Sequence, residues 1–406
     1  MPAGFRAGAA AIGIKASGGP DLGLLATVGG PAAAAATFTS NRLAAAPVRL
    51  SRAHLAASRG RVAAVLSTSG CANAATGPDG ERDQEELAGI VATATGVPIE
   101  ETFALSTGLI GTRLPVTRLG DAIPALARKG LASSDDALAA LAAQLCTTDS
   151  RQKWATTTVE LPASGGETRA VRVSGIAKGV GMLHPRMATM LSIILTDADA
   201  EPSTLDGMLR PIVRDTWNQV TVDGDTSTND TVLLLASGDA GATNVEPGSA
   251  SAVLLGRAVH AVARSLARQQ AADGEGATTL ITCEVAGAAT DEQARAAARA
   301  VVASSLVKAA VHGRDPNWGR VAAAVGNAEL EGRPVPVQES RLRIALAGVE
   351  VFAGRPVPFE KAEASARMQA PEVVIAVDLG LGDGWGEAFG CDLTPEYVIE
   401  NSAYST

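Results

Sequence analysis

Segments that favour strands alternate with segments that favour helices along most of this chain, and this alternation limits its fold more than any other feature. Residues 61–66 (RVAAVL) and 102–111 (TFALSTGLIG) are apolar enough for buried strands. Between them, residues 83–96 have the apolar spacing of a helix and end at a glycine. Strands that alternate with helices are typical of α/β proteins, so we expect an α/β fold in which helices cover mixed sheets.

The same pattern continues through the middle and the end of the chain. Residues 121–145 are expected to form two helices with a break near residue 130. Residues 156–161 and 169–176 resemble a β-hairpin that leads into the sequence KGVGMLHPRMATML, and the apolar residues after it favour a strand. Further helices are expected over 203–219, 250–272 and 292–310. Further strands are expected over 277–287, 341–352 and 372–390, and those in the last third alternate like antiparallel strands.

The chain is long enough for more than one hydrophobic core. Its 406 residues suggest about two or three domains at roughly 100–200 residues each. We expect two domains, with a smaller C-terminal domain that begins after about residue 326. Aromatic residues make up only 3% of the chain and hydrophobic residues 46%, so the cores are expected to consist mainly of Ala, Val, Leu and Ile.

Charge and hydropathy argue against two classes of partner. The net charge is −9 and no Lys/Arg cluster stands out, so the chain lacks the basic surface that binds nucleic acid. No apolar run approaches the roughly 18 residues needed to span a bilayer, so we expect no membrane partner.

The four cysteines indicate neither a metal site nor a disulfide framework. Cys71, Cys146, Cys283 and Cys391 lie far apart, with no CxxC pair and no neighbouring histidine. The apolar stretch near the N-terminus is short, rich in glycine and followed by Lys15, unlike a secretory signal. We therefore expect reduced thiols and a cytoplasmic location.

Thr189 stands alone inside an apolar run, where packing in a strand would explain it. A threonine hydroxyl is a weak nucleophile unless a base activates it, and an N-terminal threonine has its own α-amine for this purpose. Thr189 becomes N-terminal only if the bond after Ala188 is cut. The small Ala188 and the nearby Gly179 and Gly181 suit a turn in which the hydroxyl attacks the preceding carbonyl, and hydrolysis of the resulting ester would free the threonine.

The motif KG-x-GM-x-HP-x-MATML resembles the self-cleaving ornithine acetyltransferases, the ArgJ family of the cyclic arginine pathway. Other motifs of that family follow in the same order over essentially the whole chain: GFRAGAAAIGIK, STGLIG, TTDS, VDGDTSTNDTVLLL, DGEGATTLI, HGRDPNWGRVAAAVG and the terminal NSAYST. The resemblance implies the self-processed DmpA/ArgJ-like fold of ornithine acetyltransferases, with mixed sheets layered with helices. It also implies an α chain of residues 1–188 and a β chain of residues 189–406.

The resemblance assigns roles to individual residues. Thr189 corresponds to the nucleophile, which cleavage after Ala188 releases, and Thr107 and Gly108 correspond to the oxyanion hole. The positions that correspond to substrate-binding residues are Thr147, Lys178, Thr189, Glu275, Asn401 and Thr406. Lys178 suits a carboxylate and Glu275 suits an ammonium group, as an amino-acid substrate requires.

The reaction implied is acetyl transfer from N2-acetyl-L-ornithine to L-glutamate through an acetyl-Thr189 ester. The resemblance implies no metal or organic cofactor and an α2β2 heterotetramer. It leaves open whether acetyl-CoA also serves as a co-substrate that acetylates glutamate, because a CoA site need not leave a local motif.

Some positions depart from the family pattern. Cys71 replaces an amide in the stretch TSGCAN, Ser150 is followed by RQK where the family commonly has Pro-Lys, and Arg186 stands where asparagine is frequent. Because the nucleophile and the matched binding residues are unchanged, these departures bear on fine substrate preference more than on the reaction itself.

Three other patterns have ordinary structural explanations. VDGDTSTND begins like a calcium loop, but counted from Asp223 the second position is Gly224 and the twelfth is Leu234, so a hydrogen-bonded turn fits better. His184 has no acidic neighbour and precedes proline, which favours a role in the turn. HGRDPNWGR has turn chemistry, and whether its Asn317 and Arg320 help to orient the site stays open.

Two other functional classes remain open. One is an N-terminal-threonine amidohydrolase or peptidase that uses water as the acceptor. The other is an inactive, unprocessed binding protein. Acetyl transfer that is faster than hydrolysis would exclude the first, and cleavage before Thr189 would exclude the second.

Overall fold

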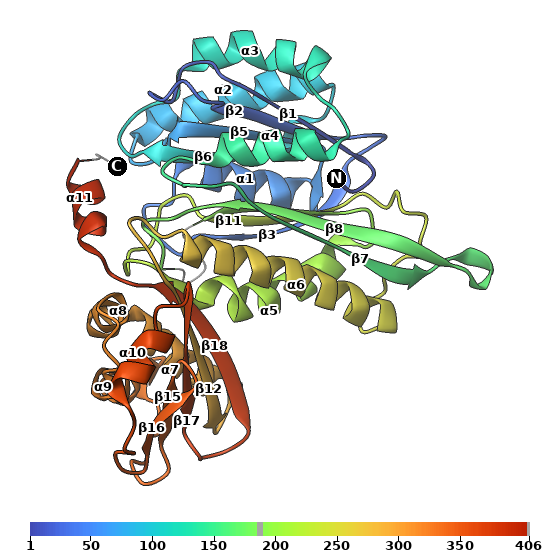
Figure 1. The fold of residues 1–406 in the computed structure, drawn as a ribbon. Helices are drawn as coiled ribbons and strands as arrows, with labels where there is room; N and C mark the ends of the chain where they lie inside the picture. Colours follow the sequence, from blue (N-terminus) through green and yellow to red (C-terminus); the bar gives the residue numbers. More distant parts are fainter. Residues whose placement is uncertain (185–189, 404–406) are drawn as a thin grey trace.

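The computed structural model describes residues 1–184 and 190–403. The chain forms three large sheets with helices between and around them (Figure 1). Two sheets are stacked in the upper part of the view, and the third forms a separate unit below them (Figure 1). The α/β fold class predicted from the alternating segments is confirmed.

The first sheet has helices on both faces. Its strands are, in order, β1 (Phe5–Ala10), β2 (Leu22–Thr27), β5 (Ala64–Cys71) and β6 (Thr102–Leu109). The outer face is covered by α2 (Gly77–Thr95) and α3 (Val116–Lys129), the inner face contacts α4 (Asp135–Leu145), and α1 (Ala46–Ala57) lies along the free edge of β6. Leu87 and Ile123 pack fully buried on the outer face, and Leu141 on the inner one.

The second sheet combines strands from both sides of residues 185–189. Its strands are, in order, β4 (Arg61–Val62), β3 (Ala32–Phe38), β11 (Thr231–Ala236), β9 (Leu191–Thr196), β8 (Thr168–Lys178) and β7 (Lys153–Pro162). β9 runs parallel to β11 and antiparallel to β8, and β11 runs antiparallel to β3. The outer face is covered by α5 (Pro202–Asp215) and α6 (Ala250–Ala272).

The third sheet forms the lower unit of the molecule (Figure 1). Its strands are, in order, β10 (Val220–Thr221), β18 (Gly384–Cys391), β12 (Leu280–Ala288), β17 (Glu372–Asp378), β15 (Arg343–Leu346) and β16 (Val349–Ala353). Helices of this unit are α7 (Asp291–Ala303), α8 (Ser305–His312), α9 (Trp318–Gly326) and α10 (Lys361–Arg367), with a short hairpin of β13 (Glu329–Leu330) and β14 (Arg333–Pro334).

The lower unit begins well before the boundary expected after about residue 326. Its hydrophobic core already includes Ile281 and Cys283 of β12, together with Val301 of α7. β12 pairs with both β17 and β18, so it cannot be separated from the later strands. The sequence interpretation missed this because α7 to α9 continue the Ala-rich helical composition of the preceding α6.

Side-chain caps set the start of α4, α6, α7 and α8. Ser134 and Ser249 are the N-caps of α4 and α6, and each hydroxyl accepts a hydrogen bond from a backbone N–H of the first turn at 3.1 Å. The helix expected over 292–310 is two helices, because Ser304 ends α7 and caps α8 by accepting from Val307 N at 3.3 Å. The helix expected over 203–219 ends at Asp215 and continues as a 3-10 turn, Trp217–Gln219.

The last helix, α11 (Pro395–Ala403), leaves the lower unit and runs back toward the first sheet (Figure 1). It has no buried residue, and Val398 and Ile399 are each 62% exposed. Thr394, just before the helix, donates a hydrogen bond to Gly276 O at 2.7 Å. Polar contacts of this kind, rather than a packed core, hold α11 in place.

Candidate active site

One cavity of about 230 Å³ gathers most of the residues that the family resemblance singles out. It lies where the ends of β6, β8 and α6 meet α11. The assigned residues that line it are Thr107, Gly108, Thr147, Lys178, Glu275 and Asn401. Three further assignments, Ala188, Thr189 and Thr406, lie outside the described residues, but Met190 also lines the cavity.

Thr107 and Gly108 reach the cavity from the end of β6. Gly108 has a φ of +128°, and a Cβ at this position would overlap the backbone of Gly70, so the local path of the chain requires glycine. Lys178 Nζ donates to Thr107 Oγ1 at 3.0 Å. Because an ammonium group only donates, the threonine hydroxyl acts as acceptor here and keeps its own hydrogen for another partner. This geometry suits a donor to a developing oxyanion.

Glu275 joins three parts of the cavity wall. Its Oε1 accepts from Thr148 Oγ1 and its Oε2 from Asn401 Nδ2, both at 2.9 Å. Its backbone N–H donates to Val180 O at 2.9 Å. A Cβ at Gly181 would overlap the Glu275 carboxylate, so glycine is needed here for close approach. The carboxylate is thus fixed by both the middle and the end of the chain.

The segment VDGDTSTND forms an acidic loop, residues 223–230, along another side of the cavity. Asp223 Oδ1 accepts from Leu183 N at 2.9 Å, and burial raises the pKa of Asp223 above its ordinary value. Asn229 Nδ2 donates to Ala72 O at 2.7 Å and to Ser106 O at 2.8 Å, which ties the loop to β6. The sequence interpretation of a hydrogen-bonded turn is confirmed, and Asp223, Asp225 and Asp230 are lining residues that it did not assign.

Tyr397 of α11 also lines the cavity and was missed by the sequence interpretation. Burial, together with the negative charges of Asp223, Glu275 and Asp225, raises the pKa of Tyr397 to about 12. The phenol therefore stays protonated and available as a donor at neutral pH. Nothing in its sequence neighbourhood distinguishes it from an ordinary helix residue.

Two motifs considered in the sequence lie elsewhere. His184 Nδ1 lies 2.8 Å from Thr221 Oγ1, and its backbone O accepts from Thr226 Oγ1 at 3.0 Å, which fits the structural role expected for this histidine. Arg320 donates to Leu306 O at 2.8 Å on the lower unit, and neither it nor Asn317 is among the described residues that line the cavity.

The altered position Cys71 is buried next to the site rather than in it. Its Sγ donates to Thr112 O at 3.2 Å, beyond the end of β6. Ala72 lines the cavity in its place. The change from an amide to a thiol therefore affects packing beyond the end of β6 and not a side chain that lines the cavity in the described part of the chain.

The site shows no sign of a metal centre or a membrane location in the described chain. No group of three or more His, Cys, Asp or Glu side chains in residues 1–184 and 190–403 is placed to hold a metal ion. No described helix is both long enough and apolar enough to cross a bilayer. The polar groups of the cavity are instead one ammonium group, several carboxylates, hydroxyls and amides.

The layered α/β fold and this cavity, which combines hydroxyl and amide hydrogen-bond donors with charges of both signs, are typical of an enzyme that acts on small polar molecules. Comparison with known proteins identifies the family to which this enzyme belongs. The family model "ArgJ family" matches residues 6–406, and the chain belongs to this family.

Individual relatives agree with that family over the full chain. The arginine biosynthesis bifunctional protein ArgJ of Thermus thermophilus is 44% identical over 406 residues, which is 100% of this chain and 99% of the relative. The protein of the same name from Deinococcus radiodurans is 42% identical, with 100% and 98% covered. The crystal structure of the arginine biosynthesis bifunctional protein ArgJ from Bacillus halodurans is similar with a TM-score of 0.51 and 41% identity, covering 53% of this chain and 100% of that one.

Proposed function

We propose that this acyltransferase of arginine biosynthesis moves an acetyl group from N2-acetyl-L-ornithine to L-glutamate, with Thr189 as the nucleophile. The observation that supports this most is the convergence of Thr107, Gly108, Lys178 and Glu275 on one small cavity whose wall includes Met190, the residue after Thr189. The family and the curated relatives are those of arginine biosynthesis. The products are L-ornithine and N-acetyl-L-glutamate.

The first half of the reaction forms an ester. The Thr189 hydroxyl attacks the acetamide carbonyl while its α-amine accepts the hydroxyl proton. Thr107 Oγ1 and the Gly108 N–H donate to the oxygen that becomes negative. The C–N bond then breaks, the leaving nitrogen takes the proton, and ornithine departs from acetyl-Thr189.

The second half returns the enzyme to its starting state. The glutamate amine attacks the ester carbonyl, the C–O bond to Thr189 breaks, and the threonine oxygen recovers a proton. Lys178 offers a cation for a substrate carboxylate, and Glu275 with the acidic loop offers anions for an ammonium group. Because both substrates use one cavity in turn, we expect ping-pong kinetics. No metal or organic cofactor takes part, and acetyl-CoA is proposed only as an additional acetyl donor.

The nucleophile requires cleavage of the Ala188–Thr189 bond, and we propose that the protein cleaves itself there. The products would be residues 1–188 and 189–406, the latter with 406 − 188 = 218 residues, about 54% of the chain. The Bacillus halodurans chain is matched over its whole length while covering 53% of this chain, which supports a cut of this kind.

We propose that the two products stay together and assemble as α2β2. Support comes from the second sheet, in which β3 and β8 precede the cut while β9 and β11 follow it. The location proposed is cytoplasmic, supported by four free cysteines. Size-exclusion chromatography with light scattering should give a mass near 2 × 40.9 = 81.8 kDa, and a mass near 41 kDa would contradict the tetramer.

A denaturing gel with N-terminal sequencing tests cleavage, and a coupled assay tests the reaction. We expect two bands, with the larger one starting at Thr189, and ornithine release that depends on glutamate. Ornithine release at the same rate without glutamate would identify the protein as an amidohydrolase. A single uncut band without activity would identify it as an unprocessed binding protein.

A further inference from the structure

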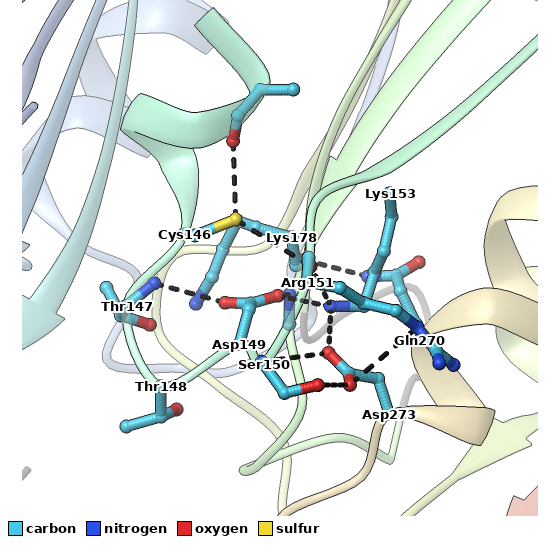
Figure 2. A network of polar contacts seen from close by, with 12 residues as sticks. Cys146, Thr147, Thr148, Asp149, Ser150, Arg151, Lys153, Lys178, Gln270 and Asp273 are labelled. Atoms are coloured by element: carbon cyan, nitrogen blue, oxygen red, sulfur yellow. Dashed lines mark hydrogen bonds and ion pairs between the residues drawn. The ribbon is translucent and has the colours of Figure 1, made fainter. Parts of the chain in front are cut away.

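Three charged side chains contact one another beneath the cavity, almost completely shielded from water (Figure 2). Lys153 Nζ lies 2.6 Å from Asp149 Oδ1 and 2.6 Å from Asp273 Oδ2. The Lys153 and Asp149 side chains are 0% exposed. The three residues come from the start of β7, the loop after α4 and the end of α6, so one lysine joins three elements.

The Asp149 carboxylate also accepts hydrogen bonds from the backbone of two residues that line the cavity. Its Oδ1 accepts from Gly179 N at 2.9 Å, and its Oδ2 accepts from Thr147 N at 3.1 Å. Gly179 follows Lys178 directly and has a φ of +134°, a conformation that favours glycine. Asp149 therefore fixes the backbone of Thr147 and the backbone of Gly179, the residue after Lys178.

The other members of the network hold Asp149 and the same strand end. Asp273 accepts from Ser150 N at 3.2 Å and from the Ser150 hydroxyl. Gln270, one turn earlier on α6, donates to Lys178 O at 2.7 Å. Burial opposes ionisation of Asp149, but the positive charges of Lys178 and Lys153 hold its pKa below the ordinary value. The carboxylate is thus ionised throughout the neutral range.

Stability alone is a poor explanation for such a network. Removing three charged groups from water costs free energy that their mutual attraction often fails to recover, and apolar residues can replace buried ion pairs at little cost. Apolar residues cannot replace the acceptor that this carboxylate provides for two backbone N–H groups, those of Thr147 and Gly179.

We propose that Asp149 is a positioning residue, held in place by Lys153 and Asp273, that sets Thr147 and Lys178 at the separation the substrate requires. Asp149 does not line the cavity among the described residues and so acts through its neighbours. The inference rests on the proposed function, because Thr147 and Lys178 are substrate-binding residues only if that function holds.

The test is Asp149→Asn, which keeps the shape and removes one acceptor. An amide offers an oxygen to only one of the two backbone N–H groups, and its NH₂ faces the other. We expect the KM for N2-acetyl-L-ornithine to rise about tenfold to a hundredfold, with kcat changed less than about threefold, because the loss is in substrate placement and not in the reacting groups. Calorimetric titration with ornithine should show a parallel loss of affinity.

The matched control is Glu387→Gln, which removes the charge of a second buried carboxylate that does not line the cavity. Glu387 accepts from Arg264 Nε and Nη2, each at 2.6 Å, between β18 and α6. We expect it to lower the melting temperature as much as Asp149→Asn does while leaving the KM unchanged. Equal losses of melting temperature with unchanged KM in both variants would overturn the proposal, because the network would then be merely structural.

Two further variants keep the proposal testable if Asp149→Asn does not fold. Lys153→Met leaves Asp149 and Asp273 without their shared cation, and we expect a raised KM. The pair Lys153→Met with Asp273→Asn removes one charge of each sign and should recover most of the loss, because Asp149 then no longer repels a second unpaired carboxylate. No recovery in the pair would contradict the proposal. Absence of transfer by the unmodified enzyme would instead contradict the proposed function, and the ornithine titration would still report on Asp149.

Discussion

Thr107 and Gly108 reach the cavity from β6, a strand packed into the core: Phe103, Ala104 and Leu105 just before them are at most 4% exposed. Asn401 instead reaches the cavity from α11, a helix without a buried residue. The core of the first sheet fixes Thr107 and Gly108, whereas Asn401 is held by its contact to Glu275 and by the hydrogen bond from Thr394 to Gly276. The proposed oxyanion donors are thus held by a packed core, while the position of α11 can change at little cost in folding free energy. We call these two sides the strand side (β6, β8 and β9) and the helix side (α11).

The largest effect should come from the strand side, where β9 begins two residues after Thr189 and is buried throughout. Thr189→Ala removes both the nucleophile and the group that starts cleavage. We expect one uncut chain and a loss of activity of about 10⁶-fold, as for nucleophiles of other covalent enzymes. A gel and the glutamate-dependent assay measure both. Retained transfer would remove Thr189 as the nucleophile.

Gly108→Ala should have the next largest effect on activity. The new methyl group would overlap the Gly70 backbone, so the strand side must move, and we expect about 1–3 kcal/mol less stability and a kcat about 10²–10³-fold lower. Gly111→Ala is the control, since Gly111 also has a positive φ but has no atom near the added methyl. Its kcat should stay normal. Thermal unfolding and initial rates separate the two variants.

Thr107→Val removes only the hydroxyl from the strand side. We expect kcat to fall about 10²-fold with the KM less affected, because the hydroxyl acts mainly on the oxyanion. Lys178 Nζ also loses an acceptor at 3.0 Å, so some rise in KM should accompany this. Thr112→Val, whose hydroxyl donates to Leu109 O at 3.1 Å, should leave both constants unchanged. Unchanged kcat in Thr107→Val would exclude this hydroxyl from the oxyanion hole.

The smallest effects should come from the helix side. Asn401→Ala removes the contact to Glu275, and we expect the KM to rise about tenfold while the melting temperature stays within about 1 °C, because α11 contributes no buried side chain. Val398→Ser and Ile399→Ser, on the exposed part of α11, should change neither value. A large loss of stability in any of the three would show that the two sides do not differ as described.

Local patterns in the sequence predicted many elements because local physics fixes them. The helix over 250–272 matches α6 because Ser249 caps it and apolar residues recur on one side. The strands that lead to Thr107 and Lys178 are apolar runs with glycines at their ends. The assignment of cavity residues came from the family motifs, since Glu275 alone resembles an ordinary exposed charge.

Contacts between distant segments were not predictable in this way. Lys153 and Asp273 are a buried pair, yet each is surrounded in sequence by residues typical of a surface turn. The pKa of Tyr397 is raised by burial and then by the negative charges of Asp223 and Glu275, which lie more than a hundred residues away in the sequence. The boundary expected after about residue 326 failed for the same reason, because only strand pairing shows that β12 belongs with β17 and β18.

The second sheet has a consequence for folding. β8 and β9 are hydrogen-bonded neighbours on opposite sides of the proposed cut, as are β3 and β11. Before cleavage the sheet forms within one molecule, but after cleavage a denatured enzyme is two separate polypeptides that must meet again to rebuild it. Refolding then becomes a second-order process whose success depends on concentration. The proposed cleavage would thus make the enzyme active and, by the same step, remove its ability to refold unaided at low concentration.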